Sequence, residues 1–445
     1  MKLAIHNEVA VSNDEVRQLD RAYVFHSWSM QGNLNPLVIA GAQGCELWDY
    51  EGNTWLDFSS QLVNVNIGYQ HPRVLAAMKA QLETLVTIAP ATANLARGEA
   101  AKRIVDLAPA GFSKVFFTNA GADANENAIR MARLYTGRDK VLSAYRSYHG
   151  NTGSAIAATG DWRRVPNEFS RGHVHFFNPY LYRSEFNAAT EEEECQRALA
   201  HLRRIIECEG PTAIAAILLE SIPGTAGILV PPAGYMQGVR ALTNEFGIVL
   251  ILDEVMAGFG RTGSWFAFEQ DGVVPDLVTF AKGVNAGYVP AGGVLISEPI
   301  ARYFDDHFFA GGLTYSGHPL AMAAIVATID AMKEEKVVEN AASIGNEVLR
   351  PGVEALAEKH AIIGEVRGRG LFQALELVSS REQKTPLTAA DMAAIKGALT
   401  EAGLLAFVVE NRIHVVPPCT ITAEQVAQGL AIFDAVFARF ASLAK

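Results

Sequence analysis

Cysteine is scarce in this chain of 445 residues, and its spacing argues against two classes of protein. The four cysteines, Cys45, Cys195, Cys208 and Cys419, form no C-x-x-C pair and show no metal-ligand spacing. They indicate reduced thiols rather than the disulfide framework of a secreted protein. We therefore predict no metal site and a cytoplasmic location.

Long apolar runs and basic clusters are also missing. No apolar run approaches the roughly 18 residues that a membrane span requires, and the segment Met1 to Glu8 lacks the apolar core of a signal peptide. The net charge is −11 and the basic residues are scattered, which argues against nucleic acid as a partner. We expect a soluble protein with neither a membrane nor a nucleic-acid partner.

The sequence does contain enough apolar residues for a large core. It is 49% hydrophobic and 19% charged, and its length suggests two or more domains. From Val115 to about Ile296 apolar, β-prone segments alternate with helical segments, which is typical of an α/β sheet covered on both faces. The expected strands are 115–117, 140–142, 213–219, 248–252 and 277–280.

The segments on either side of this alternation differ from it. Before it we predict a helix at 14–27, strands near 38–39, 46–48 and 54–58, and a helix from Pro72 to about Val86. After it we predict a helix near 318–334, strands at 404–409 and 412–416, and a helix at 423–442. We assign 1–60 to the N-terminal segment of a small domain, 61–320 to a large domain and 321–445 to the C-terminal small α+β domain. The acidic run 191–194 predicts a solvated first turn of a helix that extends to about Cys208.

Lys282 and Asp253 each follow an apolar strand. Lys282 comes just after the strand at 277–280, and Asp253 comes directly after the strand at 248–252. Side chains at the carboxyl ends of neighbouring strands in such a sheet can face one crevice. Pyridoxal phosphate (PLP) needs this pair, a lysine for a Schiff base and an acid on the ring nitrogen. A buried lysine alone is more often a salt-bridged structural residue, so further motifs must decide between the two interpretations.

A strand–turn–helix segment from Phe116 to Glu126 is the first of these motifs. The helix extends to about Tyr135, with Gly137 at its C-terminus. Free N–H groups at such a helix start bind phosphate, and the small Gly121 and Ala122 let an anion approach the backbone. An ordinary capped helix is the alternative, but beside a lysine and an aspartate the phosphate interpretation is the better one.

Tyr148 lies in a loop, Tyr145 to Gly153, next to His149 and Gly150. An aromatic ring beside a glycine can lie flat on a cofactor ring, although a core tyrosine would explain the residue equally well.

The segment Gly258 to Gly263 fits the dinucleotide pattern G-x-G-x-x-G. That motif should open a helix immediately after a strand. Here residues 253–257 intervene and the aromatic segment 265–268 follows, so we do not predict a nicotinamide or flavin site.

Together these motifs resemble those of the class III aminotransferases, PLP enzymes of fold type I, from about Trp28 to Phe437. Within that family the chain is most similar to the pyruvate-dependent ω-transaminases, including the taurine–pyruvate and β-alanine–pyruvate types. The resemblance implies an α/β fold, with a large domain around a mostly parallel seven-stranded sheet and a small α+β domain. It also rests on segments 66–72, 148–150, 253–263, 281–283, 287–290 and 314–319, and on Glu220, Gly227, Pro231 and Pro232.

The resemblance also implies roles for individual residues. Lys282 forms the aldimine with PLP and moves the proton, Asp253 keeps the ring nitrogen protonated, and Tyr148 stacks on one face of the ring. The implied cofactor-binding residues are Gly121, Ala122, Tyr148, His149, Glu220, Asp253, Val255, Met256, Lys282 and, from the neighbouring subunit of a homodimer or of a tetramer, Thr314. The implied substrate-binding residues are Leu62, Val63, Ile88 and Arg412.

Several positions depart from the pattern of the family. Ala122 stands where the family usually has a serine in the phosphate loop. Members that use 2-oxoglutarate carry an arginine where this chain has Asn151, so we disfavour 2-oxoglutarate as acceptor. Val63 replaces a tryptophan found in many amine-accepting members. Phe407 stands where the family often has a mobile arginine that binds carboxylates. Arg412 either takes over carboxylate binding or is a salt-bridged strand residue.

The implied reaction is a ping-pong transfer of a terminal amino group from an amine or ω-amino acid to a keto acid, with pyruvate as the expected acceptor. Another PLP reaction, such as decarboxylation, racemisation or an amino shift, is the nearest alternative. A nicotinamide oxidoreductase and a non-catalytic PLP-binding protein are the more distant ones. The amino donor is not determined by the sequence.

Overall fold

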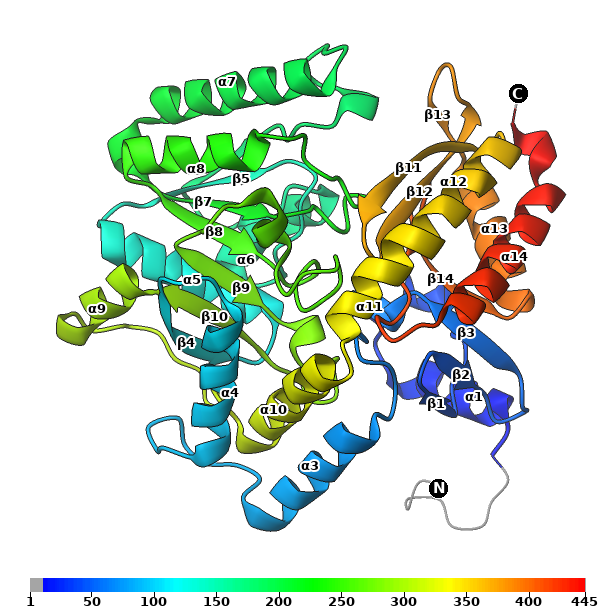
Figure 1. Ribbon diagram of the computed structural model, residues 1–445, viewed down its shortest axis with the longest axis horizontal. Coiled ribbons are helices and arrows are strands. Elements are labelled where there is room, and N and C mark those ends of the chain that lie inside the picture. Colours follow the sequence, from blue (N-terminus) through cyan, green and yellow to red (C-terminus); the bar gives the residue numbers. More distant parts are fainter. Residues whose placement is uncertain (1–10, 445) are drawn as a thin grey trace.

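The computed structural model describes residues 11–444 and contains two β-sheets, each flanked by helices (Figure 1). The sheet of the larger body has seven strands in the order β4-β10-β9-β8-β7-β5-β6, in which β10 runs antiparallel to β4 and β9 and the other pairs are parallel. This is the mostly parallel sheet that the sequence predicts. Its strands are β4 (Phe112–Thr118), β5 (Lys140–Ala144), β6 (His173–Phe176), β7 (Ile214–Glu220), β8 (Val249–Asp253), β9 (Leu277–Phe280) and β10 (Gly292–Ser297).

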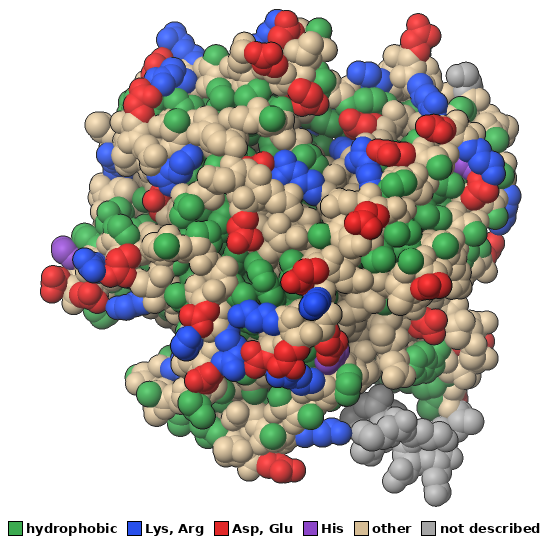
Figure 2. All heavy atoms as spheres, in the orientation of Figure 1, with side chains coloured by type: hydrophobic (Ala, Val, Ile, Leu, Met, Phe, Trp, Pro, Cys, Tyr) green, Lys and Arg blue, Asp and Glu red, His purple; other side chains and the backbone are tan. Residues whose placement is uncertain are grey.

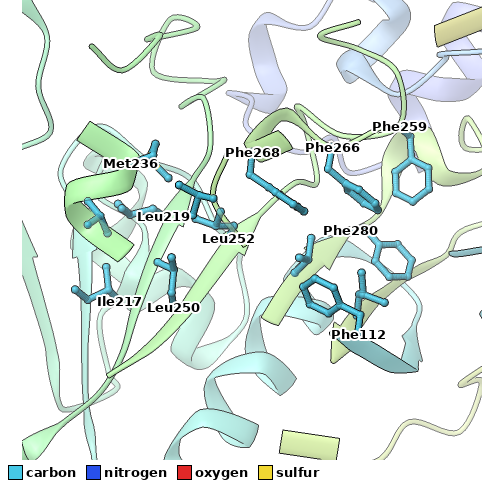
Figure 3. Packing of buried hydrophobic residues seen from close by; sticks show 14 of the residues in the cluster. Phe112, Ile217, Leu219, Met236, Leu250, Leu252, Phe259, Phe266, Phe268 and Phe280 are labelled. Atoms are coloured by element: carbon cyan, nitrogen blue, oxygen red, sulfur yellow. The ribbon is translucent and has the colours of Figure 1, made fainter. Parts of the chain in front are cut away.

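Both faces of the sheet are buried at its central strands, which explains why β7 and β8 are continuously apolar up to their last residues. Along β8, Leu250 and Leu252 join a cluster with Met236 of helix α8 (Tyr235–Phe246) (Figure 3). The alternate side chains, Val249 and Ile251, pack on the other face in a cluster that includes residues of helix α5 (Gly121–Thr136). A strand between two helical layers has no solvent face that would favour polar residues.

The smaller body is built from both ends of the described chain. Its sheet runs in the order β1-β2-β3-β14-β15-β12-β11, with β13 paired to β12. Strand β3 lies parallel to β14, which joins the N-terminal strands to the C-terminal ones. The strands are β1 (Gly41–Gln43), β2 (Glu46–Trp48), β3 (Thr54–Phe58), β11 (Ile363–Arg369), β12 (Phe372–Ser380), β13 (Thr385–Pro386), β14 (Leu404–Val409) and β15 (Arg412–Val415). The helices packed with it are α11 (Val337–Ser343), α12 (Arg350–Lys359), α13 (Ala389–Glu401) and α14 (Ala423–Arg439).

Helix α10 (Pro319–Glu334) connects the two bodies (Figure 1). Its first half contributes Met322 and Ile325 to the core of the larger body, and its second half contributes Ala331 and Met332 to that of the smaller one. The division at residue 320 stays a prediction, because a helix shared by two cores begins there. The remaining helices are α1 (Asn13–Tyr23), α2 (Ser60–Val63), α3 (Pro72–Thr84), α4 (Leu95–Leu107), α6 (Gly153–Ala158), α7 (Glu191–Glu209) and α9 (Glu298–Asp306).

Some predicted boundaries are wrong for local reasons. Helix α1 ends at Tyr23 rather than at residue 27. The strand expected at 38–39 lies instead at Gly41–Gln43, because pairing of Gln43 with Glu46 makes Gly44 and Cys45 a two-residue turn. Strands β6 and β10–β13 were not among those that we predicted. Strand β10 begins with two glycines, which by themselves indicate a turn rather than a central strand.

The acidic run at the start of α7 is only partly solvated, contrary to the prediction. Glu194 is fully buried. Its carboxylate accepts hydrogen bonds from the backbone N–H of Tyr180, at 2.7 Å, and from the hydroxyl of Ser184. The first turn of the helix therefore anchors the loop that follows β6.

The segment Gly258 to Gly263 forms turns rather than the start of a helix. Arg261, at its centre, is completely buried and donates hydrogen bonds to the side chains of Ser60 (3.1 Å) and Asn66 (2.9 Å) and to the carbonyl of Leu371 (3.2 Å). These contacts tie the larger body to the smaller one, which gives the glycine-rich segment a structural role.

Two properties of the described residues as a whole bear on partners. Acidic and basic side chains are intermixed on the face shown in Figure 2. None of the helices within residues 11–444 is long and apolar enough to cross a lipid bilayer.

Candidate active site

Three neighbouring strands of the seven-stranded sheet bring ionisable side chains together at their carboxyl ends. Glu220 is the last residue of β7 and pairs in register with Asp253, the last residue of β8. Asp253 in turn pairs with Thr279 of β9, and Lys282 follows that strand by two residues. Parallel strands thus bring together three side chains that are up to 62 positions apart in sequence.

Asp253 is held by a buried network of hydrogen bonds. One carboxylate oxygen, Oδ2, accepts from Nδ2 of Asn125 at 2.7 Å and from Nδ1 of His149 at 2.8 Å. The other, Oδ1, accepts from the backbone N–H of Val255 at 3.0 Å. Asn125 is itself oriented by Thr279, whose hydroxyl donates to the amide oxygen at 2.7 Å. These donors fix both oxygens of the carboxylate in place.

Lys282 lies deep in the molecule, at the wall of a neighbouring cavity that leaves its side chain half-buried. Burial lowers the pKa of its amine, whereas the charges of Asp253 and Glu220 raise it and that of Arg163 lowers it further. No hydrogen bond or ion pair engages its amine within residues 11–444. A buried amine without a salt bridge is not the structural lysine of the alternative interpretation, and its lowered pKa favours the neutral, nucleophilic form.

Glu220 accepts two backbone hydrogen bonds, from Tyr148 at 3.0 Å and from Gly224 at 2.7 Å. Burial is the main cause that raises the pKa of this carboxyl to about 7, helped by the nearby charge of Asp253 and opposed by His149. Glu220 thus holds the loop that carries Tyr148 over the strand ends.

The N-terminus of α5 lies in contact with the residues that follow β8. A Cβ added to Gly121 would lie 2.9 Å from the side chain of Val255, and one added to Gly150 would lie 2.5 Å from that of Ala122. No side chain caps the first N–H groups of α5. A side chain at position 121 or 150 would therefore clash, and the uncapped start of α5 presents backbone N–H groups close to Asp253 and Lys282, so the residues fit PLP.

A cavity of about 730 Å³ lies next to Lys282. Its walls come from both bodies of the molecule. The lining includes Trp28, Leu62, Arg146, Tyr148, Asp161, Trp162, Arg163, Arg183, Met256, Lys282, Glu376, Phe407, Glu410 and Arg412.

The structure brings most of the predicted site residues to this cavity or to the strand ends. Of the four predicted substrate-binding residues, Leu62 and Arg412 line the cavity. Val63 is buried in an apolar cluster with Met256, and Ile88 does not belong to the lining. Thr314 is exposed and lies outside the lining of this subunit's cavity.

Three residues near the site were missed by sequence reasoning. Asn125 lies within the predicted phosphate motif, four residues after Gly121 and hence on the same face of α5, but we assigned it no role. Arg146 and Arg163 line the cavity, yet nothing in the sequence distinguishes them from surface arginines. Only the signal for Asn125 could have been found, from its helical spacing.

Comparison with known proteins decides the family. The family model "Aminotransferase class-III" matches residues 29–437. The chain belongs to the class III aminotransferases. It is accordingly a PLP-dependent enzyme of fold type I that transfers amino groups between amines and keto acids, as its buried lysine and aspartate imply.

Individual relatives agree with this assignment. The taurine–pyruvate aminotransferase of Rhodobacter capsulatus is 35% identical over 404 residues, which cover 87% of each chain. The structure of a taurine:2-oxoglutarate aminotransferase from Bifidobacterium kashiwanohense, in complex with PLP and glutamate, superposes with a TM-score of 0.94 at 43% identity, covering 97% of this chain and 99% of that one. An amine transaminase from an uncultivated Pseudomonas species superposes with a TM-score of 0.90 at 33% identity, covering 94% and 98%.

Proposed function

We propose that this aminotransferase moves the terminal amino group of a short ω-amino acid, aminosulfonate or amine to pyruvate by a ping-pong mechanism. The observation that carries the proposal is the cavity beside Lys282, whose walls combine apolar side chains, such as Leu62 and Phe407, with arginines. A terminal amine can reach Lys282 while an acid group on the same molecule meets a guanidinium. The printed names of the relatives from Rhodobacter capsulatus and Bifidobacterium kashiwanohense, both taurine aminotransferases, support such a donor.

The proposed roles follow from the hydrogen bonds at the strand ends. When bound, PLP supplies an electron sink that makes the C–H bond beside the donor's nitrogen acidic. Lys282 would hold the cofactor covalently until the amine of the donor displaces it, and its freed Nζ would then take that proton and return it. Asp253, whose carboxylate is oriented by its donors, stabilises a proton on the ring nitrogen. Proton transfer by a positioned base contributes about 10²–10⁴-fold.

The other contacts are proposed to position the cofactor. The N–H groups of Gly121 and Ala122 bind the phosphate, and Tyr148 and Val255 enclose the ring. His149 acts through its hydrogen bond to Asp253. Glu220 and Met256 are proposed to border the space that the cofactor ring occupies.

Pyruvate is the proposed acceptor, and 2-oxoglutarate is a second candidate that two observations favour. Asn151 is exposed and outside the lining of the cavity, so the lack of an arginine there does not remove all cations from the site. Arg412 lines the cavity and could bind a distal carboxylate, and the Bifidobacterium kashiwanohense enzyme is named for 2-oxoglutarate.

We further propose a homodimer with shared active sites. Large apolar side chains remain exposed on the single chain, among them Leu95, Phe308 and Tyr315, which are 81%, 89% and 62% exposed. Thr314 lies next to Tyr315, where a partner subunit could receive it at its phosphate site. The expected location is the cytoplasm, in keeping with four cysteines that are all unpaired. Light scattering should give twice the chain mass of 48.0 kDa, and a monomer would contradict the shared site.

A panel of donors tested with each acceptor checks the proposed function. Taurine, β-alanine, putrescine and 1-phenylethylamine are each supplied with pyruvate or 2-oxoglutarate, and alanine or glutamate is measured. We expect alanine formation with at least one donor that bears an acid group. Formation of glutamate without alanine would show that 2-oxoglutarate, and not pyruvate, is the acceptor. Consumption of the amine without either product would favour a decarboxylase, racemase or aminomutase.

A further inference from the structure

Four arginines line the cavity, and they differ in how fully their charges are neutralised. Arg183 donates to Glu376 at 2.6 Å and to the carbonyl of Lys384 at 2.7 Å. Arg412 pairs with Glu410, and Arg163 pairs with Asp161. Arg146 has no ion pair within residues 11–444 and lies over the ring of Tyr180. The cavity is therefore rich in guanidinium groups, and their positions must decide which of them meets a substrate.

Arg163 lies in the part of the substrate-binding wall that is nearest the chemistry. Its guanidinium lies 3.9 Å from the centre of the Tyr148 ring. Of the four arginines, it is the one whose charge acts on the pKa of Lys282. A substrate whose acid group is only two carbons from its amine must find its cation near Lys282, and Arg163 is in that place.

Asp161 holds this guanidinium in one orientation. The carboxylate accepts from Nε of Arg163 at 3.0 and 3.1 Å and from Nη2, and it also accepts from the backbone N–H of Arg163 at 2.9 Å. The two side chains are 17% and 23% exposed. One edge of the planar group is thus fixed, while Nη1 has no partner within residues 11–444. A guanidinium held in this way loses little entropy when it binds an anion.

We propose that Arg163 binds the acid group, sulfonate or carboxylate, of a short amino donor and selects such donors over neutral amines. The inference rests on the proposed function and adds its specificity-determining residue. Nη1 of Arg163 donates to the acid group, the ring of Tyr148 supports the guanidinium from one side, and Asp161 holds its other edge. Arg412 is farther from the chemistry and is left for longer substrates.

Steady-state kinetics of the PLP-loaded enzyme with pyruvate tests the proposal. Arg163→Gln should lower kcat/KM for taurine and β-alanine about 10- to 100-fold, because a hydrogen bond to a charged group is lost. The value for 1-phenylethylamine should stay within about threefold. Arg163→Lys should recover part of the loss, since it restores the positive charge but not the planar pair of donors of a guanidinium. An equal loss for acidic and neutral donors would overturn the proposal.

Arg164→Gln is the matched control. Arg164 is the next residue in the same turn, pairs with Glu168 at 2.6 Å and is not in the lining of the cavity. Its substitution should leave the preference between acidic and neutral donors unchanged. If Arg164→Gln changes the preference as much as Arg163→Gln does, the effect comes from the turn and not from the guanidinium, and the proposal fails.

Binding without turnover separates this proposal from the proposed function. Isethionate carries the sulfonate of taurine but a hydroxyl in place of its amine, so it cannot react. Calorimetry should show binding to the wild-type holoenzyme and an affinity at least about tenfold weaker for Arg163→Gln. Equal affinities, or no saturable binding to the wild type, would overturn the role of Arg163. A wild-type enzyme that binds isethionate but forms alanine from no acidic donor would instead refute the proposed function.

Discussion

The two ends of the active-site cavity are built in different ways. The end that we call the reaction end consists of Glu220, Asp253 and Lys282 with their hydrogen-bond partners, and it lies at the ends of three paired strands. The rest of the cavity wall, which we call the substrate end, is formed by the turn that carries Asp161 and Arg163, next to Tyr148, and by the hairpin of β14 and β15, with Phe407 and Arg412.

The difference lies in what holds each side chain. At the reaction end, strand register and buried hydrogen bonds fix the groups, and Asp253 is only 3% exposed. At the substrate end each arginine of the turn and hairpin is held by a single carboxylate close in sequence, Asp161 or Glu410. Such local pairs can be exchanged without disturbing the sheet. The chemistry is therefore expected to be robust and the donor preference adjustable.

The largest expected effect is at Lys282. Replacing Lys282 by Ala removes both the covalent attachment and the proton carrier, so transamination should fall by at least about 10⁴-fold. Alanine formation from pyruvate measures the loss. Thermal unfolding serves as the control, because removal of a buried amine should not lower stability. Near-normal turnover by the variant would refute the reaction end as the catalytic centre.

Asp253→Asn should cost about 10²–10³-fold in kcat. The substitution keeps the shape of the side chain, but its amide must face a donor, Asn125, His149 or the N–H of Val255. The charge that stabilises a proton on the ring nitrogen is lost as well. Initial rates at saturating donor test this expectation. A change in KM alone, with kcat preserved, would show that Asp253 contributes to substrate binding and not to catalysis.

Two glycines allow the ends to be compared by one substitution. Gly150 (φ 134°) and Gly227 (φ 124°) both lie in the left-handed half of backbone space, so an alanine costs about 1–3 kcal/mol at either. At Gly150 the new Cβ would also meet the backbone of Ala122, at 2.6 Å, whereas at Gly227 it would meet only side-chain atoms, those of Arg367 and Arg412.

Gly150→Ala should therefore lower the melting temperature more than Gly227→Ala. The Gly227 variant should instead alter KM, because Arg412 is displaced into the cavity. Thermal melts monitored by circular dichroism and KM values for both acceptors check this pair. Equal melting temperatures would show that the reaction end is no more rigid than the substrate end.

The last expected effect concerns stability rather than turnover and is a pH dependence at Glu220. Its pKa is raised from an ordinary value of 4.5 to about 7 in the folded protein. Between these pH values the folded state binds a proton that the unfolded state has released, so stability falls as pH rises, by up to about 3 kcal/mol. Glu220→Gln should flatten this slope between pH 5 and 7, measured by urea unfolding of the cofactor-free protein. An unchanged slope would assign it to other groups, such as Glu254, whose buried carboxyl also has its pKa raised to about 7.

Prediction from sequence was best where a local pattern of residues specifies the element. Strands β9 and β14 have the predicted limits, and Lys282 and Asp253 lie at adjacent strand ends as expected. The prediction failed where long-range pairing overrides local preference, as for Gly292 and Gly293 in β10 and for the shifted strand β1. It also failed at Glu194, since hydrogen bonds from distant residues determine its burial.

The sequence by itself determined the family chemistry of this protein, because Lys282, Asp253 and the proposed phosphate-binding start of α5 each follow local strand, turn and helix signals. Only the tertiary structure decided which arginine meets the substrate. Arg163 reaches the cavity through the stacking of its guanidinium on Tyr148 and its bonds to Asp161, and the facing wall comes from strands some 250 positions later in the chain. Proximity of that kind depends on how the two bodies pack, and no local pattern encodes it.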